Sequence, residues 1–190
     1  MKSQYEQVFT KDHLGVKILG YALLFLMFFS FLLIAWYAPV ERTMGLVQKI
    51  FYYHVPSAWV AFLAFGVVFV CSILYLTSKD KKWDVFAASS VEIGVVFVLI
   101  VLITGPIWAR PVWEVWWTWE PRLTTTLILF LIYVAYLLLR YFGGKNEQTA
   151  KFSAVLGIIG FIDVPLVYLS INWWRRKHRR ILRVSGWSRR

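Results

Sequence analysis

The sequence predicts an all-α fold, a polytopic membrane bundle with five transmembrane helices. Of its 190 residues 59% are hydrophobic and the mean hydropathy is +0.61, well above the values of soluble domains. The apolar residues also gather in blocks of about 20, enough to cross a hydrocarbon core of roughly 30 Å as a helix. We therefore expect a single membrane domain over residues 1–190.

Each apolar block carries its own boundary signals. The first is too long for a signal-peptide core and lacks a small-residue cleavage site, so we expect it to be retained as a helix. Pro56 and Pro121 fall at the starts of the second and fourth blocks, where proline suits the first helical turn. The predicted helices cover about 18–38, 55–77, 85–103, 121–139 and 151–170, with a Trp-rich outer loop at 104–124 and a basic tail at 175–190.

Lysine and arginine are unevenly divided between the two sides of the predicted bundle. The N-terminus and the turns at 78–84 and 140–151 carry three each, whereas the loop before residue 55 and the Trp-rich loop carry two each. Because basic residues favour the cytoplasmic side, we expect a cytoplasmic N-terminus and an outer Trp-rich loop. The basic tail runs against this count. Whichever orientation holds, His54, the Trp-rich loop and His178 all follow odd-numbered helices and share one side.

Several function classes are disfavoured by composition. The net charge of +11 is spread over turns and tail, which fits membrane lipid better than nucleic acid. With Cys71 as the single cysteine, the chain has neither a thiol redox pair nor a Cys-x-x-Cys-His haem-attachment site. It also lacks a phosphate-binding Gly-x-x-x-x-Gly-Lys-Ser/Thr loop, so any use of ATP belongs to a partner.

The Trp-rich loop concentrates aromatic residues beyond what a membrane anchor needs. Five of the eleven tryptophans fall within it: Trp108, Trp113, Trp116, Trp117 and Trp119. Indole faces can stack on a planar ligand, whereas ordinary helix ends carry only one or two interfacial tryptophans. We expect a ligand platform, with an interfacial aromatic belt as the alternative. If the segment is helical, Trp113, Trp116, Trp117, Glu120 and Thr124 form one stripe.

Two histidines and two arginines flank this loop. His54 and His178, on the same side as the tryptophans, could bind a haem iron from two edges of a site, although single histidines are more often structural. Arg110 and Arg122 could pair with propionate carboxylates, or they could simply extend to the membrane interface. Glu92 and Asp163 lie inside predicted spans, where we expect a structural role.

The segment from Trp113 through Glu120 to Thr124 resembles the tryptophan-rich signature of haem-handling proteins of cytochrome c biogenesis. Thr104-Gly105-Pro106-Ile107-Trp108 ahead of it and Arg122-Leu123-Thr124 at its end are similar to one branch, the haem exporter protein C family. Tyr53-His54-Val55-Pro56 resembles that family's first haem-ligand segment, and Val164-Pro165 with Trp173-Trp174 resembles its second. The resemblance covers about residues 15–178.

The resemblance implies six membrane helices and non-covalent haem b at the outer face of the bacterial cytoplasmic (inner) membrane. It implies His54 and His178 as axial ligands, and a haem platform and chaperone contact made by Trp113, Trp116, Trp117, Trp119, Glu120 and Arg122. The implied partners are a membrane-anchored haem chaperone and the ATPase and permease subunits of an ABC-type cytochrome c maturation complex.

This chain departs from the family pattern at several positions. Glu114 stands where glycine is usual, Glu120 where aspartate is usual and Asp163 where an amide is usual. No sixth apolar span follows His178, which we interpret as a truncation or a reading-frame error.

We expect haem binding and transfer without covalent catalysis by the chain itself, so no catalytic residue is predicted. A permease subunit and a cytochrome c synthase component are the alternatives.

Overall fold

The computed structural model describes residues 13–184, with side chains described over residues 14–111 and 113–170. Among these residues, five helices are long and apolar enough to cross a membrane, which confirms the predicted helical membrane fold. The chain divides between Lys49 and Ile50 into two units. The first contains the helix α2 (His13–Leu32), which passes into a π-helical turn, η1 (Leu33–Tyr37).

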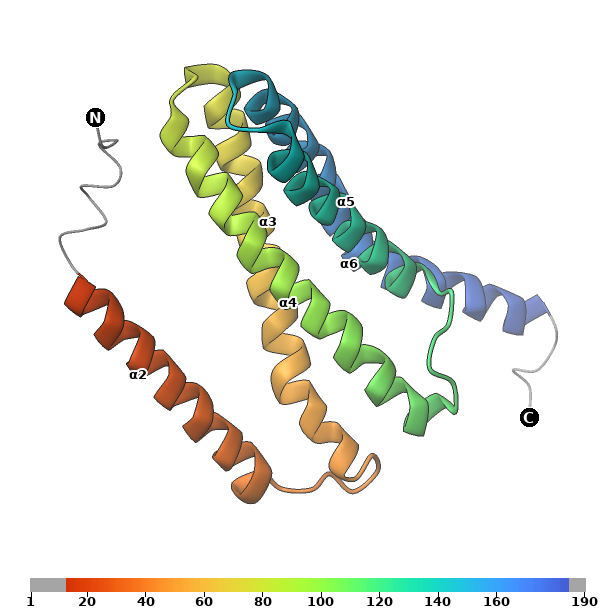
Figure 1. The fold of residues 1–190 in the computed structure, drawn as a ribbon. Helices are drawn as coiled ribbons and strands as arrows, with labels where there is room; N and C mark the ends of the chain where they lie inside the picture. The colour runs from red at the N-terminus through yellow and green to blue at the C-terminus, as the bar shows by residue number, and fades with distance from the viewer. Residues whose placement is uncertain (1–12, 185–190) are drawn as a thin grey trace. The chain divides into compact units, whose positions relative to one another are not determined.

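The second unit is a bundle of four long helices (Figure 1). The short 3₁₀ helix η2 (Leu46–Ile50) leads into it. The four helices are α3 (Phe51–Ser78), α4 (Lys81–Trp113), α5 (Pro121–Gly143) and α6 (Glu147–Val184). Two of them start at residues that favour a helix N-terminus. Asp80 accepts a hydrogen bond from the Lys82 backbone N–H at the start of α4, and Pro121 is the first residue of α5.

The core of this bundle lies between α3, α4, α5 and α6 and is built on aromatic rings set against glycines. Phe65 of α3 and Tyr133 of α5 are fully buried and stack with ring centroids 3.8 Å apart. Gly94 of α4 lies under the Phe65 ring, and Gly160 of α6 lies against Tyr133. Small residues permit this close approach of helices, as is usual in membrane bundles.

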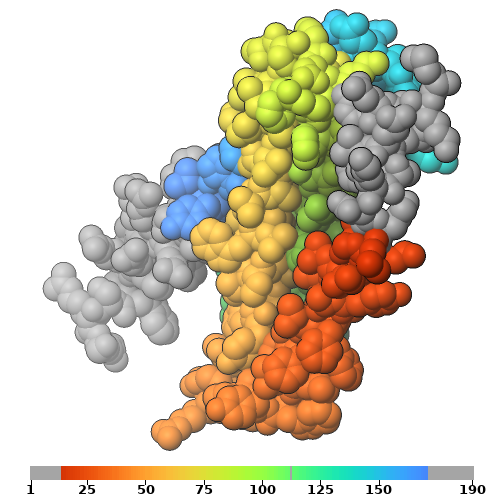
Figure 2. All heavy atoms as spheres, turned by 90° about the vertical axis from the view of Figure 1, so that its left-hand side faces the viewer, coloured from red at the N-terminus to blue at the C-terminus, as the bar shows by residue number. Residues whose placement is uncertain are grey.

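The outward face of α3 is apolar along its length. Trp59, Leu63 and Val70 are exposed there, and Figure 2 shows α3, orange to yellow, running along this face of the second unit. Successive exposed positions about one turn apart form a stripe on a single helix face. Such a stripe suits contact with lipid chains, in which exposed apolar side chains carry no hydrophobic penalty.

The predicted loop at 104–124 is wrong over its first ten residues, because α4 continues as a helix to Trp113. Pro106 and Pro111 lie inside the helix. Proline is tolerated in membrane helices where packing holds the segment in place. Here Ala109 is buried, and the Trp108 ring packs on Phe51 of α3.

The C-terminal segment also differs from expectation. The predicted fifth helix stops at residue 170, whereas α6 runs on to Val184 and includes most of the predicted basic tail. His178 therefore lies on a helix instead of an extended tail. Its side chain, like all those after residue 170, lies outside the described residues. Basic residues continue a helix readily, since Arg and Lys have good helix propensity.

The two acidic residues within the spans have different surroundings. Glu92 is exposed on α4, whereas Asp163 of α6 is buried and its Oδ2 has no hydrogen-bond partner among the described residues. An unpaired buried carboxyl group costs free energy.

Asp163→Asn is therefore expected to leave the bundle folded and to raise its free energy of unfolding at neutral pH by about 1 kcal/mol. Denaturation in mixed detergent micelles, followed by circular dichroism, would measure the change. The control is Asp163→Leu, which removes the polar group altogether. A loss of stability in the asparagine variant would show that the carboxylate itself is needed.

Candidate functional site

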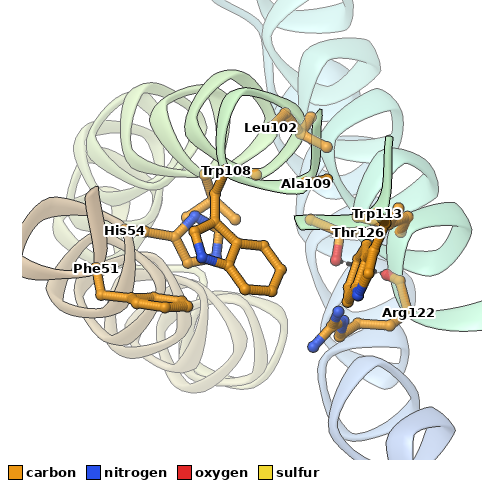
Figure 3. Close-up of a pocket in the computed structure, with 11 residues that line it drawn as sticks. Phe51, His54, Leu102, Trp108, Ala109, Trp113, Arg122 and Thr126 are labelled. Carbon is orange, nitrogen blue, oxygen red and sulfur yellow. Dashed lines mark hydrogen bonds between the residues drawn. The ribbon is translucent and has the colours of Figure 1, made fainter. Parts of the chain in front are cut away.

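A pocket of about 160 Å³ opens at the end of the bundle where α3 begins, α4 ends and α5 begins. Phe51, His54 and Trp108 line one side, and Trp113, Arg122 and Thr126 face them from the other (Figure 3). The remaining lining residues are Val101, Leu102, Gly105, Ala109 and Leu123. Three helix ends thus bring together residues up to 75 positions apart in the chain, counting from Phe51 to Thr126.

Aromatic rings form a continuous row along this pocket. The Phe51 and Trp108 ring centroids lie 5.1 Å apart, and Trp108 meets Trp113 edge to face at 4.9 Å. Both arrangements fall within the range of favourable aromatic pairs. The row combines one ring from α3 with two from the last turns of α4, so its geometry depends on the helical extension of α4.

His54 is the imidazole of this pocket. It lies in the first turn of α3, with its Nδ1 2.8 Å from Thr104 Oγ1 of α4. Its ring stands edge to face on Phe51, with centroids 6.3 Å apart. Gly105 leaves room beside it, because a Cβ atom at that position would lie 3.6 Å from His54 Cε1. The imidazole is therefore held by contacts from two helices.

Arg122 supplies the positive charge on the pocket wall. Its Nη2 lies 3.0 Å from Glu120 Oε1, in an ion pair that is partly exposed. The start of α5 holds this pair in place through threonine hydroxyls that donate to carbonyls four residues earlier. Thr124 donates to Glu120 at 3.0 Å, and Thr126 donates to Arg122 at 2.8 Å.

A second, more open hollow of about 390 Å³ also borders Trp113 and is lined by Trp113, Thr118, Trp119 and Glu120. Trp117 and Trp119 meet edge to face at 5.9 Å, and Trp119 is 75% exposed. Trp116 is 59% exposed and lines neither hollow. Residues 114–120 have no regular secondary structure, so the condition for a helical stripe from Trp113 to Thr124 is not met.

Two buried indole N–H groups have no partner among the described residues. Trp108 Nε1 and Trp117 Nε1 are both shielded from solvent and unpaired. Buried donors are normally satisfied, so each such group calls for an acceptor. Trp108, which carries one of these groups, is also a lining residue of the pocket.

Arg110, one of the two arginines considered for a carboxylate ligand, is not among the residues that line the pocket. Its Nη1 donates to the backbone carbonyl of Glu114 at 2.7 Å, closing the last turn of α4. Glu114 itself has φ of 63°, in the left-handed region that favours glycine after a helix. Arg110 therefore stabilises the turn that sets Trp113 in position.

Glu114→Gly is expected to stabilise the protein by about 1 kcal/mol, because a left-handed conformation costs a residue with a Cβ roughly that much. The midpoint of thermal unfolding in detergent would report the gain. Lys79→Gly is a matched variant, since Lys79 follows α3 with φ of 58° at the other end of the bundle. Equal gains would confirm the conformational origin, and a loss at Glu114 alone would contradict it.

Sequence reasoning did not name Phe51 or Thr126, and it included Gly105 and Trp108 only as part of the Trp-rich loop, without placing them beside His54. The missing signal was the phase of α4: Val101, Gly105, Trp108 and Ala109 share one face only if the helix runs past residue 104. The pocket does bring together His54, Trp113 and Arg122, and the hollow adjoining it holds Trp119 and Glu120. The His178 side chain lies outside the described residues.

Comparison with known proteins gives a consistent result. A protein-family model described as Heme exporter protein C matches residues 5–185. The Heme exporter protein C of Bradyrhizobium diazoefficiens is 35% identical over 151 residues, which cover 78% of this chain and 57% of that protein. The protein of the same name from Escherichia coli is 30% identical over 149 residues, 78% of this chain and 61% of that protein.

A ccmC-like mitochondrial protein of Marchantia polymorpha, named for cytochrome c biosynthesis, is 35% identical over 144 residues. These residues cover 76% of this chain and 60% of that protein. The chain thus spans about three fifths of the length of the curated relatives it matches. The family match extends over nearly the whole sequence and includes every residue of the pocket, so the chain belongs to the Heme exporter protein C family.

Proposed function

We propose that the chain binds haem at the pocket around His54 and presents it outside the cytoplasmic membrane for transfer to a haem chaperone in c-type cytochrome biogenesis. One observation supports this most strongly: an imidazole, a row of aromatic rings and a guanidinium share one pocket at a bundle end. The names of the relatives, which refer to haem export and cytochrome c biosynthesis, point to the same ligand.

The residues present suit haem b. Haem has a flat apolar ring, an iron that accepts imidazole nitrogen and two propionate carboxylates. His54 would ligate the iron, the row formed by Phe51, Trp108 and Trp113 would contact the ring, and Arg122 would pair with a propionate.

The size of the pocket indicates how the ligand would be held. Its 160 Å³ is below the 300–1,000 Å³ typical of pockets that enclose a small molecule. The described residues would therefore grip one edge of haem and leave the rest accessible, with the Trp113–Glu120 hollow beside it. Partial enclosure suits a protein that must release its ligand to another.

The bound haem would supply the reactive iron, while the chain contributes binding and orientation. Trp113 and Arg122 would hold the ring from the α4 and α5 side, and His54 from the α3 side. Trp116 and Trp119, both exposed, would contact the chaperone. His178 at the second axial position, an outer location of the pocket and partnership with ABC-type ATPase and permease subunits remain part of this proposal.

A haem titration of the protein in detergent micelles tests the proposal. We expect one haem per chain, a low-spin spectrum typical of two imidazole ligands, and movement of the haem to an added apo-acceptor protein. Thioether-linked cytochrome formed by this chain alone would instead support a synthase. Failure to bind haem, in protein shown by circular dichroism to be helical, would refute the proposal.

A further inference from the structure

One polar contact outside the pocket lining restrains the His54 ring. Thr104 of α4 places its Oγ1 2.8 Å from His54 Nδ1, linking two helices through side chains 50 residues apart. The contact is partly buried, at the end of the bundle that holds the pocket. What this contact does to the imidazole depends on which of the two atoms donates.

The surroundings of Thr104 decide the direction of this hydrogen bond. A threonine hydroxyl carries one proton and two lone pairs. Its Oγ1 donates to the carbonyl oxygen of Ile100 at 2.7 Å, and the carbonyl of Val101 lies at 3.4 Å. A carbonyl can only accept, so the hydroxyl proton points along α4. The lone pairs of Oγ1 then face His54, and Nδ1 must be the donor.

A neutral imidazole has only one N–H, so donation from Nδ1 leaves Nε2 with a free lone pair. The ring is also flanked by Phe51, which stands edge to face on it. Nε2 is therefore the nitrogen available to a ligand in the pocket.

We propose that Thr104 is a positioning residue for His54, which selects the Nδ1–H tautomer and reserves Nε2 for iron. The assignment of iron rests on the proposed function, whereas the tautomer does not. Histidines that bind metals usually donate their other N–H to a neighbouring acceptor, and loss of that acceptor typically lowers metal affinity roughly 10–100-fold.

The first test uses haem-free protein. Nitrogen NMR of protein labelled with ¹⁵N-histidine distinguishes protonated from unprotonated ring nitrogens, and the chain has only three histidines. The His54 signals are identified by their loss in His54→Gln. We expect the Nδ1–H form in the native protein and in Thr104→Ser, and a mixture of both forms in Thr104→Val. An Nε2–H form in the native protein, or no change in Thr104→Val, would overturn the proposal.

The second test is haem affinity. Thr104→Val should weaken binding roughly 10–100-fold, and Thr104→Ser should restore it. Thr125→Val is the matched control, because Thr125 donates to Pro121 on α5 and lies outside the pocket lining. Unchanged affinity in the isosteric valine variant would mean that Thr104 only packs. If the native protein bound no haem, the proposed function would fail while the tautomer result still stood.

Discussion

His54→Ala is expected to lower haem affinity by roughly 100-fold or more, because losing even a supporting partner of a metal ligand costs roughly 10–100-fold. No other imidazole lines the pocket among the described residues, so no nearby side chain can replace it. The remaining aromatic row and Arg122 would retain haem weakly, without an axial bond from α3. Titration with haem measures the loss of affinity, and the absorption spectrum of the bound haem reports the loss of the axial bond.

The two other histidines provide comparisons for this experiment. His178→Ala should also remove the spectrum of two imidazole ligands, if the second axial position is filled as proposed. His13→Ala should change nothing, because the predicted topology places His13 on the opposite side of the membrane. An unaltered spectrum in both His54→Ala and His178→Ala would reject the axial assignment.

Gly94→Ala is expected to destabilise the bundle by about 1–3 kcal/mol, the usual cost of overpacking a core. A Cβ atom there would lie 2.4 Å from Cε1 of Phe65. Phe65 cannot move away, because its ring is fully buried and stacked on Tyr133 at 3.8 Å. The added methyl group therefore forces α4 away from α3. Denaturation in mixed micelles, followed by tryptophan fluorescence, measures the loss.

Gly66→Ala is the matched control for this variant. Gly66 lies on α3, and a Cβ atom there would meet its nearest neighbour, a Phe161 ring atom, at 3.8 Å, an ordinary contact. Since alanine favours a helix over glycine by about 1 kcal/mol, Gly66→Ala should be neutral or stabilising. Equal behaviour of the two alanine variants would contradict the packing at Gly94.

The helical spans were predictable from sequence because a segment that crosses lipid must be long and apolar. Such segments are visible in the sequence as blocks of hydrophobic residues. The same logic placed His54 near Trp113, since residues after odd-numbered helices share a side, and the pocket contains both. The extent of α4 was not predictable in this way. Pro106 and Pro111 suggest a break, whereas the packing of Trp108 on Phe51 and the burial of Ala109 favour a helix there.

Site roles that depend on helix phase or on a local turn were also beyond the sequence. Thr104 contacts His54, and Gly105 leaves space beside the His54 ring, because of the angular position that α4 gives them. For Arg110 the sequence offered a carboxylate partner or the membrane interface, and it gave no sign of the left-handed turn at Glu114 that brings a backbone carbonyl within reach of Arg110. The spacing of residues in the sequence does not specify the rotational phase of α4 or the left-handed turn at Glu114.

The division of the tryptophans between helix and irregular chain has an entropic consequence. Trp108 is preorganised on α4, so its contact with a ligand costs little further ordering. Residues 115–119, which include Trp117 and Trp119, have no regular secondary structure, and ordering such backbone costs about 1–2 kcal/mol per residue. We therefore expect Trp108 on α4 to contribute more to ligand affinity than Trp117 and Trp119. The irregular segment that carries Trp117 and Trp119 can then release one binding partner for another at little cost in affinity.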